Sequence, residues 1–336
     1  MDSTAVNRPR ATVELPPGPL TTAELAAAVP DAADRERYRR IWHGMYRRID
    51  QADDLQLRSA ALARTWPEGV LRGRSAALLW GDDSVPADAL PEIWLPATRK
   101  TCEGRVYRYG RLPGYAVTEI DGLRVTTPLR TCRDLAVDLE FEDAVVAVER
   151  LCAMVAELPA QLRAAIEHPS GRGAHHFARV VDAYDPGSLS AMSTRARLSL
   201  ADAGCGNFRH GHRVVLGSGT VELPLADPAA RCVVFTAPAT ARRDRATVRQ
   251  QSLLQGAGWT VIIVRERGRG AVSPQRSTGG SIGTSPGSGT APEDGQAGIP
   301  RWAAGLLAAR WPATELRLPA DGGPAEDPHG LWGPAW

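Results

Sequence analysis

Lysine is almost missing from this sequence, because Lys100 is the only lysine among its 40 basic residues. Arginine therefore carries the positive charge, and its guanidinium group makes forked contacts to phosphate. The 38 acidic residues nearly balance that charge, and the formal net charge of +2 gives no indication of nucleic acid. A GC-rich genome, which favours arginine codons, is the simpler explanation for the arginine usage.

Closely spaced cysteines and long apolar runs are also missing. The five cysteines include no C-x-x-C pair, which excludes a zinc knuckle or a redox pair and favours buried free thiols in a reducing compartment. No apolar run approaches the ~18 residues of a membrane span, and residues 1–10 lack the apolar core of a signal peptide. We therefore expect a cytoplasmic chain with no membrane partner.

Residues 20–53 have the outline of a small winged helix. Thr21 and Glu24 carry the signature of a capping box, so a helix is expected to begin there and to end before Pro30. A short basic helix is expected next. Residues 41–49, with aromatic side chains around Gly44, suit a strand.

The rest of the ordered sequence mixes helices and strands. The helical period is clear over residues 142–157, and the continuous apolar run "WTVIIV" (259–264) predicts a strand buried on both faces. The segment "GTVELPLADPAARCVVFTAPA" (219–239) predicts two strands of a half-buried hairpin. The segment "VVLGSGTV" (214–221) predicts another hairpin turn just before it.

These patterns predict a multidomain chain of the α+β and α/β classes. Its expected parts are a disordered tail (1–19), a winged-helix-like domain (20–53), a mixed domain (54–138), a helical connector (139–188), an α/β domain (189–266), a disordered Gly-, Ser- and Pro-rich linker (267–299), and a short helix with a loose tail (300–336). The short helix, residues 301–311, is expected to dock on the preceding domain or to bind a partner.

The order of elements over residues 190–264 resembles the Vsr-like, restriction-endonuclease-like domain found at the C-terminus of many bacterial proteins. The resemblance is carried by "SAMSTRARL", "VELPLADPAARCVVFTAPA", "ARRDRATVRQ" and "AGWTVIIV". It implies an endonuclease-like fold, in which carboxylates of neighbouring strands hold one or two divalent cations that activate a water molecule.

The residues that this resemblance would assign to the metal are mostly replaced. Ser193 stands where the family has Glu, Phe235 and Ala237 fill the acidic positions of a later strand, and only Glu222 survives as a candidate catalytic residue. One carboxylate does not make a magnesium site, so a solvent-facing strand residue is the simpler interpretation of Glu222. We expect no bound metal and no cofactor, with Mg²⁺ only if other acids have rebuilt the site.

The first half of the chain resembles the AbiEi-type antitoxins of type IV toxin–antitoxin systems. The resemblance is carried by "TTAELAAA" with "YRRIWHGMYRRI", and by the pattern G-L-x-V-T-x-P-x-R-T-x-x-D-L-A at residues 122–136. It implies a DNA-binding N-terminus and a toxin partner. Only residues 29–40 are available for the two helices that the family places before its wing, so one helix must serve both roles or be missing.

Arginines of this region and of the helix near residue 245 are the candidate DNA contacts, because they can hold phosphates without reading sequence. A solvated, arginine-coated helix face is the alternative interpretation. The candidates are Arg35, Arg37, Arg39, Arg40, Arg47, Arg48, Arg242, Arg243, Arg245 and Arg249.

The histidine pairs at 175–176 and 210–212 have no acids or cysteines at ligand spacing, so they are interpreted as surface histidines. The function expected from the sequence is that of a DNA-associated, antitoxin-like regulator with an inactive endonuclease-like domain. An active metal-dependent endonuclease and a non-catalytic protein-interaction scaffold are the alternatives.

Overall fold

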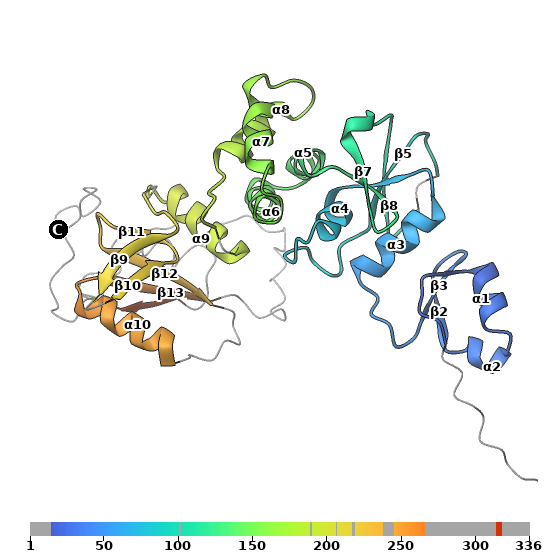
Figure 1. Cartoon of the computed structure of the whole chain (residues 1–336), viewed down its shortest axis with the longest axis horizontal. Coiled ribbons are helices and arrows are strands. Elements are labelled where there is room, and N and C mark those ends of the chain that lie inside the picture. Colours follow the sequence, from blue (N-terminus) through green and yellow to red (C-terminus); the bar gives the residue numbers. More distant parts are fainter. Residues whose placement is uncertain are drawn as a thin grey trace, which may run out of the picture. The chain divides into compact units, whose positions relative to one another are not determined.

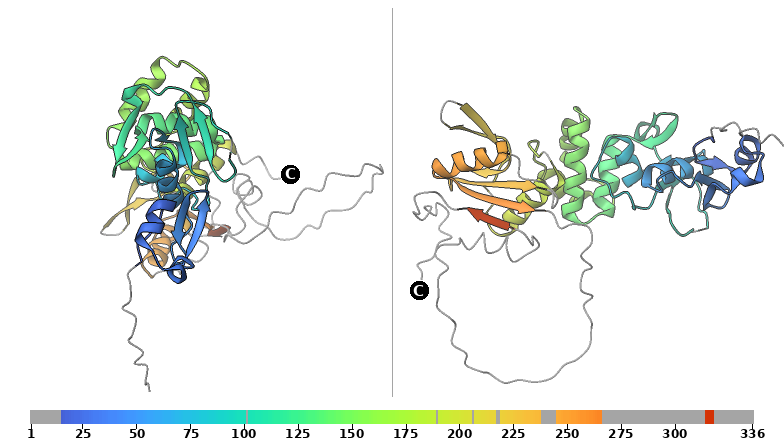
Figure 2. Two further views of the ribbon diagram at one scale, coloured as in Figure 1. Left: turned by 90° about the vertical axis from the view of Figure 1, so that its right-hand side faces the viewer. Right: turned by 90° about the horizontal axis from the view of Figure 1, so that it is seen from below.

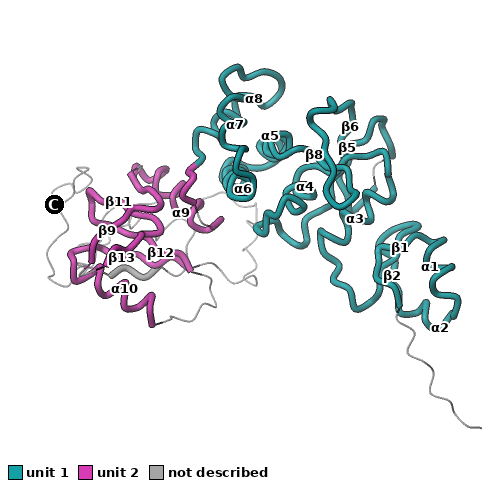
Figure 3. Tube along the Cα trace, viewed as in Figure 1, with its two compact units in different colours: residues 1–184 teal, residues 185–336 magenta. Residues whose placement is uncertain are grey.

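A computed structural model describes residues 15–100, 102–188, 190–205, 207–216, 219–237 and 245–265, together with the backbone of residues 314–317. Within these ranges the chain forms helices and four separate sheets, so the expected mixed α+β class is confirmed. The chain divides into two compact units, residues 1–184 and 185–336 (Figure 3). Among the helices described, none is long and apolar enough to cross a membrane.

The first part of unit 1 is a three-stranded antiparallel sheet with two short helices (Figure 1). Its elements are β1 (Leu20–Thr21), α1 (Thr22–Ala28), α2 (Ala32–Arg35), β2 (Tyr38–Trp42) and β3 (Met45–Arg48), and the strand order is β1-β3-β2. Leu25, Val29 and Tyr38 are buried between helix and sheet. The predicted capping box is present, because the Thr21 side chain accepts from the Glu24 N–H and the Glu24 carboxylate accepts from the Thr21 N–H.

The basic stretch that follows is a β-hairpin, not a helix followed by one strand. The predicted helix is confined to the four residues of α2, so Arg39 and Arg40 lie on β2. The turn includes Gly44, whose φ of 81° is a conformation that favours glycine. Pairing of β2 with β3 brings Tyr38 and Met45 into the core, and this burial explains why strands form here.

The second part of unit 1 is a five-stranded mixed sheet with the order β6-β5-β4-β8-β7. Its elements are α3 (Leu55–Thr65), β4 (Val70–Leu71), α4 (Gly73–Leu79), β5 (Glu92–Leu95), β6 (Val106–Tyr109), a 3-10 turn (Gly114–Ala116), β7 (Val117–Ile120), β8 (Leu123–Thr126) and α5 (Pro128–Asp138). On β5, Ile93 and Leu95 pack into the apolar core with α3 and α4. The alternate residues Glu92 and Trp94 point to the opposite face, which carries α5.

Three further helices complete unit 1. They are α6 (Phe141–Met154), α7 (Leu158–Glu167) and α8 (Ala174–Asp182). They pack against α5 and against one another, burying Leu151, Leu162 and Phe177. Residues 139–184 therefore belong to the same compact unit as the sheet before them.

Unit 2 is built on a four-stranded sheet with the order β11-β12-β13-β14. Its elements are α9 (Ala191–Asp202), β9 (His212–Leu216), β10 (Gly219–Leu223), β11 (Ala226–Asp227), β12 (Cys232–Ala237), α10 (Arg245–Gly256), β13 (Thr260–Arg265) and β14 (Thr314–Arg317). β12 and β13 are parallel, with α10 between them in sequence. Ile262 packs with Leu200 of α9, and Ile263 packs with Leu254 of α10. The prediction of a strand buried on both faces is therefore confirmed.

The hairpin predicted for residues 219–239 is wrong in most of its pairing. β10 pairs with β9 across the predicted turn, and only the short β11 pairs with β12. A bend at Pro224 and Leu225 separates β10 from β11. Proline lacks the N–H that a continuous strand would need there.

The C-terminal part of the chain contributes a strand that the sequence reading did not anticipate. Residues 314–317, expected in a loose tail, form β14 and pair antiparallel with β13 (red in Figure 2). The helix predicted at 301–311 and the linker predicted at 267–299 lie outside the described residues.

None of the five cysteines forms a disulfide, and four of them are buried. Burial raises the pKa of the Cys152 thiol to about 12 and also raises the pKa values of Cys132 and Cys232. These thiols are therefore protonated core side chains at neutral pH, as the sequence predicts.

Candidate functional site

Three of the predicted DNA contacts bind their own chain. Arg35 Nε donates to a carbonyl oxygen at the C-terminal end of α1 at 2.6 Å, where helix carbonyls lack an intrahelical partner. Arg47 donates to three carbonyl oxygens in the segment 48–51 at 2.9–3.2 Å, and Arg48 donates to the carbonyl oxygen of Leu15 at 2.8 Å. These side chains hold the small sheet and its flanking segments together.

Arg37, Arg39 and Arg40, which we call the hairpin arginines, are exposed to solvent. Arg39 contacts only backbone carbonyls, and the Arg40 guanidinium lies 6.0 Å from the ring centre of Tyr46. Within the described part of the chain, no carboxylate lies within ion-pair distance of the three guanidiniums. Arg39 also lies directly opposite Arg47 in the strand register, and Asp53, 3.7 Å from Arg47, offsets part of the repulsion between these like charges.

The other predicted basic contacts belong to α10 and to the residues before it. Arg245 and Arg249 are exposed and lie one helical turn apart. Arg242 and Arg243 lie outside the described residues.

Glu222 lies on the exposed face of the β9–β10 hairpin and pairs with a base. Its side chain is 53% exposed, and its Oε2 lies 3.2 Å from Nε of Arg213, directly opposite on β9. Phe235 packs in the apolar cluster that includes Leu254 of α10. Where the structure describes the chain, no group of three His, Cys, Asp or Glu side chains could hold a metal ion.

A buried polar chain joins Asp185, His210 and Ser193, which lies on α9. The His210 Nε2 lies 2.6 Å from Ser193 Oγ, and its Nδ1 lies 2.9 Å from Asp185 Oδ2. The His210 side chain is fully buried. The prediction that His210 is a surface histidine without an acid partner is therefore wrong, because Asp185 comes from a distant part of the sequence.

The order of these three groups matches that of a Ser–His–Asp proton relay, in which the carboxylate orients the imidazole and the imidazole faces the hydroxyl. Their burial does not suit catalysis, since Ser193 is only 4% exposed and the His210 ring does not reach solvent. We interpret the cluster as a polar link that fixes the first turn of α9 against the segments before α9 and β9.

Asp185 is held ionised by this cluster. Burial would raise the pKa of Asp185. Hydrogen bonds from His210 and from the Gly187 N–H lower this pKa, and so do the nearby charges of His210 and Arg197. Together they lower the pKa of Asp185 from 3.8 to about 2.

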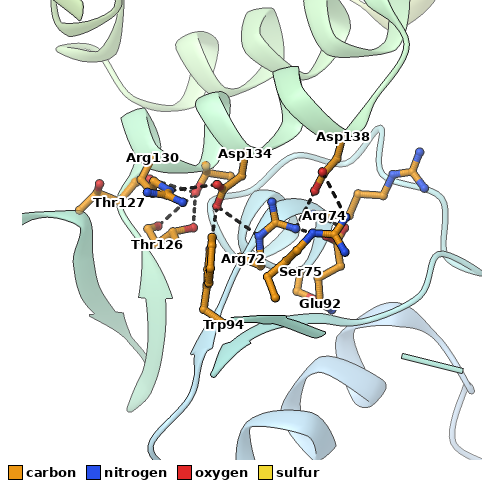
Figure 4. A network of polar contacts seen from close by, with 12 residues as sticks. Arg72, Arg74, Ser75, Glu92, Trp94, Thr126, Thr127, Arg130, Asp134 and Asp138 are labelled. Atoms are coloured by element: carbon orange, nitrogen blue, oxygen red, sulfur yellow. Dashed lines mark hydrogen bonds and ion pairs between the residues drawn. The ribbon is translucent and has the colours of Figure 1, made fainter. Parts of the chain in front are cut away.

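A second buried polar cluster lies in unit 1, around Arg72. The Arg72 side chain is 3% exposed, and its Nη1 donates to Glu92 Oε2 at 2.8 Å and to Asp138 Oδ2 at 2.7 Å. Its Nε lies 3.3 Å from Asp134 Oδ2 (Figure 4). A buried unpaired charge costs several kcal/mol. This one guanidinium therefore ties the start of α4 to β5 and to α5.

Two more arginines balance the remaining negative charge. Arg130 Nε donates to Asp134 Oδ1 at 2.9 Å, and Arg108 donates to Asp138 Oδ1 at 3.2 Å. The indole of Trp94 lies beside this cluster, with Nε1 3.4 Å from Asp134 Oδ2 and two guanidinium carbons 5.1 and 5.7 Å from its ring centre (Figure 4). Three arginines thus meet three carboxylates, and no negative charge is left over for a cation.

The pKa shifts in this cluster follow from burial and from charge. Burial would lower the pKa of Arg72, but the carboxylates of Asp134, Glu92 and Asp138 outweigh it and raise that pKa. Burial raises the pKa of Glu92, and Arg72 offsets part of the rise. Burial would also raise the pKa of Asp138, but Arg72 and Arg108 lower it. Arg72 therefore stays charged, and its charge opposes the rise that burial causes in the pKa values of the neighbouring Glu92 and Asp138 carboxyl groups.

Sequence reasoning located only part of this cluster. Arg130 and Asp134 belong to the pattern at residues 122–136, where their i, i+4 spacing on a predicted helix is a usable signal. Arg72 and Glu92 carried no comparable signal, since each lies on a different element.

Replacing Arg72 with methionine tests whether its charge holds the first unit together. Arg72→Met keeps the length of the side chain but leaves Glu92, Asp134 and Asp138 without their shared partner. We expect a loss of ~3–5 kcal/mol in the free energy of unfolding, measured by urea denaturation of the full chain. Arg108→Met is the matched control, because Arg108 is 45% exposed and its ion pair is worth ~0–1 kcal/mol. Equal losses in the two variants would contradict the assigned role.

Replacing Asp185 with asparagine tests the polar link in unit 2. Because the folded pKa is below the unfolded value, the carboxylate stabilises the fold above about pH 4, and this contribution is lost as pH falls towards 2. We expect Asp185→Asn to lower the free energy of unfolding by ~2 kcal/mol at pH 7 and by roughly half as much near pH 3. Asp202→Asn, at an exposed position of α9, is the control in the same urea titrations. If the loss of unfolding free energy in Asp185→Asn did not change with pH, the proposed contribution of the ionised carboxylate would be refuted.

Comparisons with protein-family models, with curated proteins and with solved structures gave no match to this chain.

Proposed function

We propose that this chain is a DNA-associated regulator of the AbiEi-like antitoxin kind, with a winged-helix-like N-terminus that contacts DNA. In this proposal the second unit is a restriction-endonuclease-like domain that has lost its metal site. The proposal rests on the sequence resemblances, on the charge of the N-terminal hairpin and on the side chains of unit 2.

The observation that carries the DNA proposal is the exposure of the hairpin arginines without acidic partners. Glu24 pairs with Arg64 and Asp50 pairs with Arg48, and among the described residues neither Asp34 nor Glu36 forms an ion pair with the three guanidiniums. The three guanidiniums are therefore available to phosphate oxygens, with which arginine makes strong charge-assisted hydrogen bonds. Such contacts give affinity without sequence information.

The element order in unit 2 supports an endonuclease-like ancestry, and its side chains support a non-catalytic role. A helix, four strands, a helix and a buried parallel strand follow one another, an order close to the one that the resemblance implies. Glu222 is exposed and paired with Arg213, and Ser193 and Phe235 occupy positions of acids in the family. Metal-assisted phosphodiester hydrolysis needs several oxygen ligands around one ion. Glu222 alone does not supply them.

Neutralising the hairpin arginines tests the DNA proposal. The probe is a fluorescent DNA duplex from the region upstream of the coding sequence, and binding is measured by anisotropy at several salt concentrations. The Arg37→Gln/Arg39→Gln/Arg40→Gln variant should bind roughly tenfold or more weakly, because three phosphate contacts are lost. The slope of log K against log salt should also fall by about 3.

A triple variant with the same loss of charge on other exposed positions is the control, namely Arg163→Gln/Arg172→Gln/Arg179→Gln. It should retain both the affinity and the salt slope. No binding of the wild-type chain to DNA at low salt would favour the scaffold alternative.

A plasmid-nicking assay with Mg²⁺ or Mn²⁺ tests the loss of catalysis. We expect no metal-dependent cleavage by the wild-type chain, and no difference between it and Glu222→Ala. Cleavage that depends on metal and disappears in Glu222→Ala would overturn the non-catalytic assignment and establish the endonuclease alternative.

A further inference from the structure

A pocket of about 190 Å³ opens on one face of the five-stranded sheet in unit 1. The register places Val70 directly opposite Trp94, and Val117 opposite Thr126. Trp94 and Thr126 both bond to residues of α5, so the pocket lies on the sheet face that carries α5. The pocket is lined by Glu68, Val70, Trp94, Leu95, Pro96, Gly110, Arg111, Leu112, Val117 and Arg124.

The floor and the rim of this pocket differ in chemistry. Val70 is a buried apolar side chain, and Trp94, directly opposite it on β5, adds an aromatic side chain to the lining. Arg111 and Arg124 are exposed and give the rim two positive charges. An apolar floor with a few polar groups at its edge is the usual composition of a small-molecule site.

The charges at the rim favour an anion. Arg124 is held in place by donating Nη1 to the backbone oxygen of Glu68 at 2.6 Å, and its guanidinium keeps further N–H donors. The Glu68 carboxylate lies 3.6 Å from Arg99, which offsets its negative charge. Arg111 makes no hydrogen bond or ion pair with any residue that the structure describes. Glu119 lies directly opposite Arg124 in the register of β7 and β8, so its carboxylate offsets part of that charge. Arg111 is therefore the guanidinium at the rim that remains available to an anion.

An exposed aromatic ring lies in the segment between two of the residues that line the pocket. Tyr115, in the 3-10 turn between β6 and β7, is 87% exposed, the highest value among the exposed large apolar side chains described. It lies between Leu112 and Val117, which both line the pocket. A tyrosine ring that is left in water at this place is available to stack on a flat ligand.

We infer that this pocket binds a nucleotide, with the base on the apolar floor and the phosphate at the rim beside Arg111. The volume is below the ~300 Å³ at which pockets begin to enclose drug-sized ligands, so the pocket can hold the base of one nucleotide while the sugar and phosphate remain at the rim. A free mononucleotide and an unpaired nucleotide of a single strand share this chemistry. Duplex DNA keeps its bases stacked, so this site is distinct from the proposed duplex contact of the hairpin arginines.

The test measures binding of two probes to the full chain. AMP is titrated by calorimetry, and a fluorescent single-stranded oligonucleotide of mixed sequence is followed by anisotropy. We expect the wild-type chain to bind one or both, and Arg111→Glu to weaken the binding roughly tenfold or more, since a charge-assisted phosphate contact is lost. Arg172→Glu makes the same charge change at an exposed position outside the pocket, and it should bind like the wild type.

A second variant tests the floor without changing the charge. Val117→Trp fills the pocket and should abolish binding of both probes, provided that its circular dichroism and melting temperature match those of the wild type. Arg111→Glu keeps the inference testable if Val117→Trp does not fold, because Arg111 lies in an exposed loop. Binding of the strand but not of AMP supports the inference and identifies a strand as the source of the nucleotide. Binding of AMP but not of the strand supports it for free nucleotides.

Three results would overturn the inference. The first is that neither probe binds, and the second is that Arg111→Glu and Arg172→Glu weaken binding equally. The third is that inorganic phosphate displaces AMP at the same concentration, which would show that the base is not recognised. The Arg37→Gln/Arg39→Gln/Arg40→Gln variant should bind AMP normally. Failure of the duplex proposal and failure of this one are therefore distinguishable.

Discussion

The first unit depends on neutralising one buried positive charge. Arg72 lies at the start of α4, and its carboxylate partners come from β5 and α5, so the ion pairs form only when these elements meet. Gly73 belongs to the same arrangement, because a Cβ atom there would lie 2.5 Å from the Glu92 carboxylate. A misplaced element would leave a charge buried without a partner, and this penalty disfavours alternative packings of similar hydrophobicity.

Local signals in the sequence predicted many of the elements. The Thr21–Glu24 capping box and the apolar run of β13 each identify an element without reference to the rest of the chain. The hairpin at residues 38–48 was predicted only in part, as a strand over residues 41–49 after a basic helix. Arginine favours helices, and the competing signal, burial of Tyr38 and Met45, depends on a core that only the folded chain supplies. The pairing of β10 was missed for a related reason, since strand partners are chosen by packing.

The candidate sites also combine features that the sequence predicted with contacts that it did not predict. The exposed arginines and the isolation of Glu222 follow from residue types that the sequence displays. The His210 cluster was missed because Asp185 and Ser193 lie 25 and 17 residues from the histidine, beyond any local ligand spacing. The pocket beside Trp94 has no motif, since its lining residues come from four strands and the connections next to them. The sequence therefore indicated which residue types could take part in a site better than it indicated which of those residues lie in contact.

The strand β14 makes the second unit discontinuous in sequence. β13 and β14 are adjacent in the sheet, yet residues 266–313 lie between them. The entropy of closing a loop grows only with the logarithm of its length, about 0.6 kcal/mol for each doubling. Insertions and deletions between the two strands are therefore nearly neutral for the sheet, whereas a chain shortened before residue 314 would leave the backbone of β13 as an open edge for another strand. Evolution can vary the length of this connection freely, provided that the residues after it are kept.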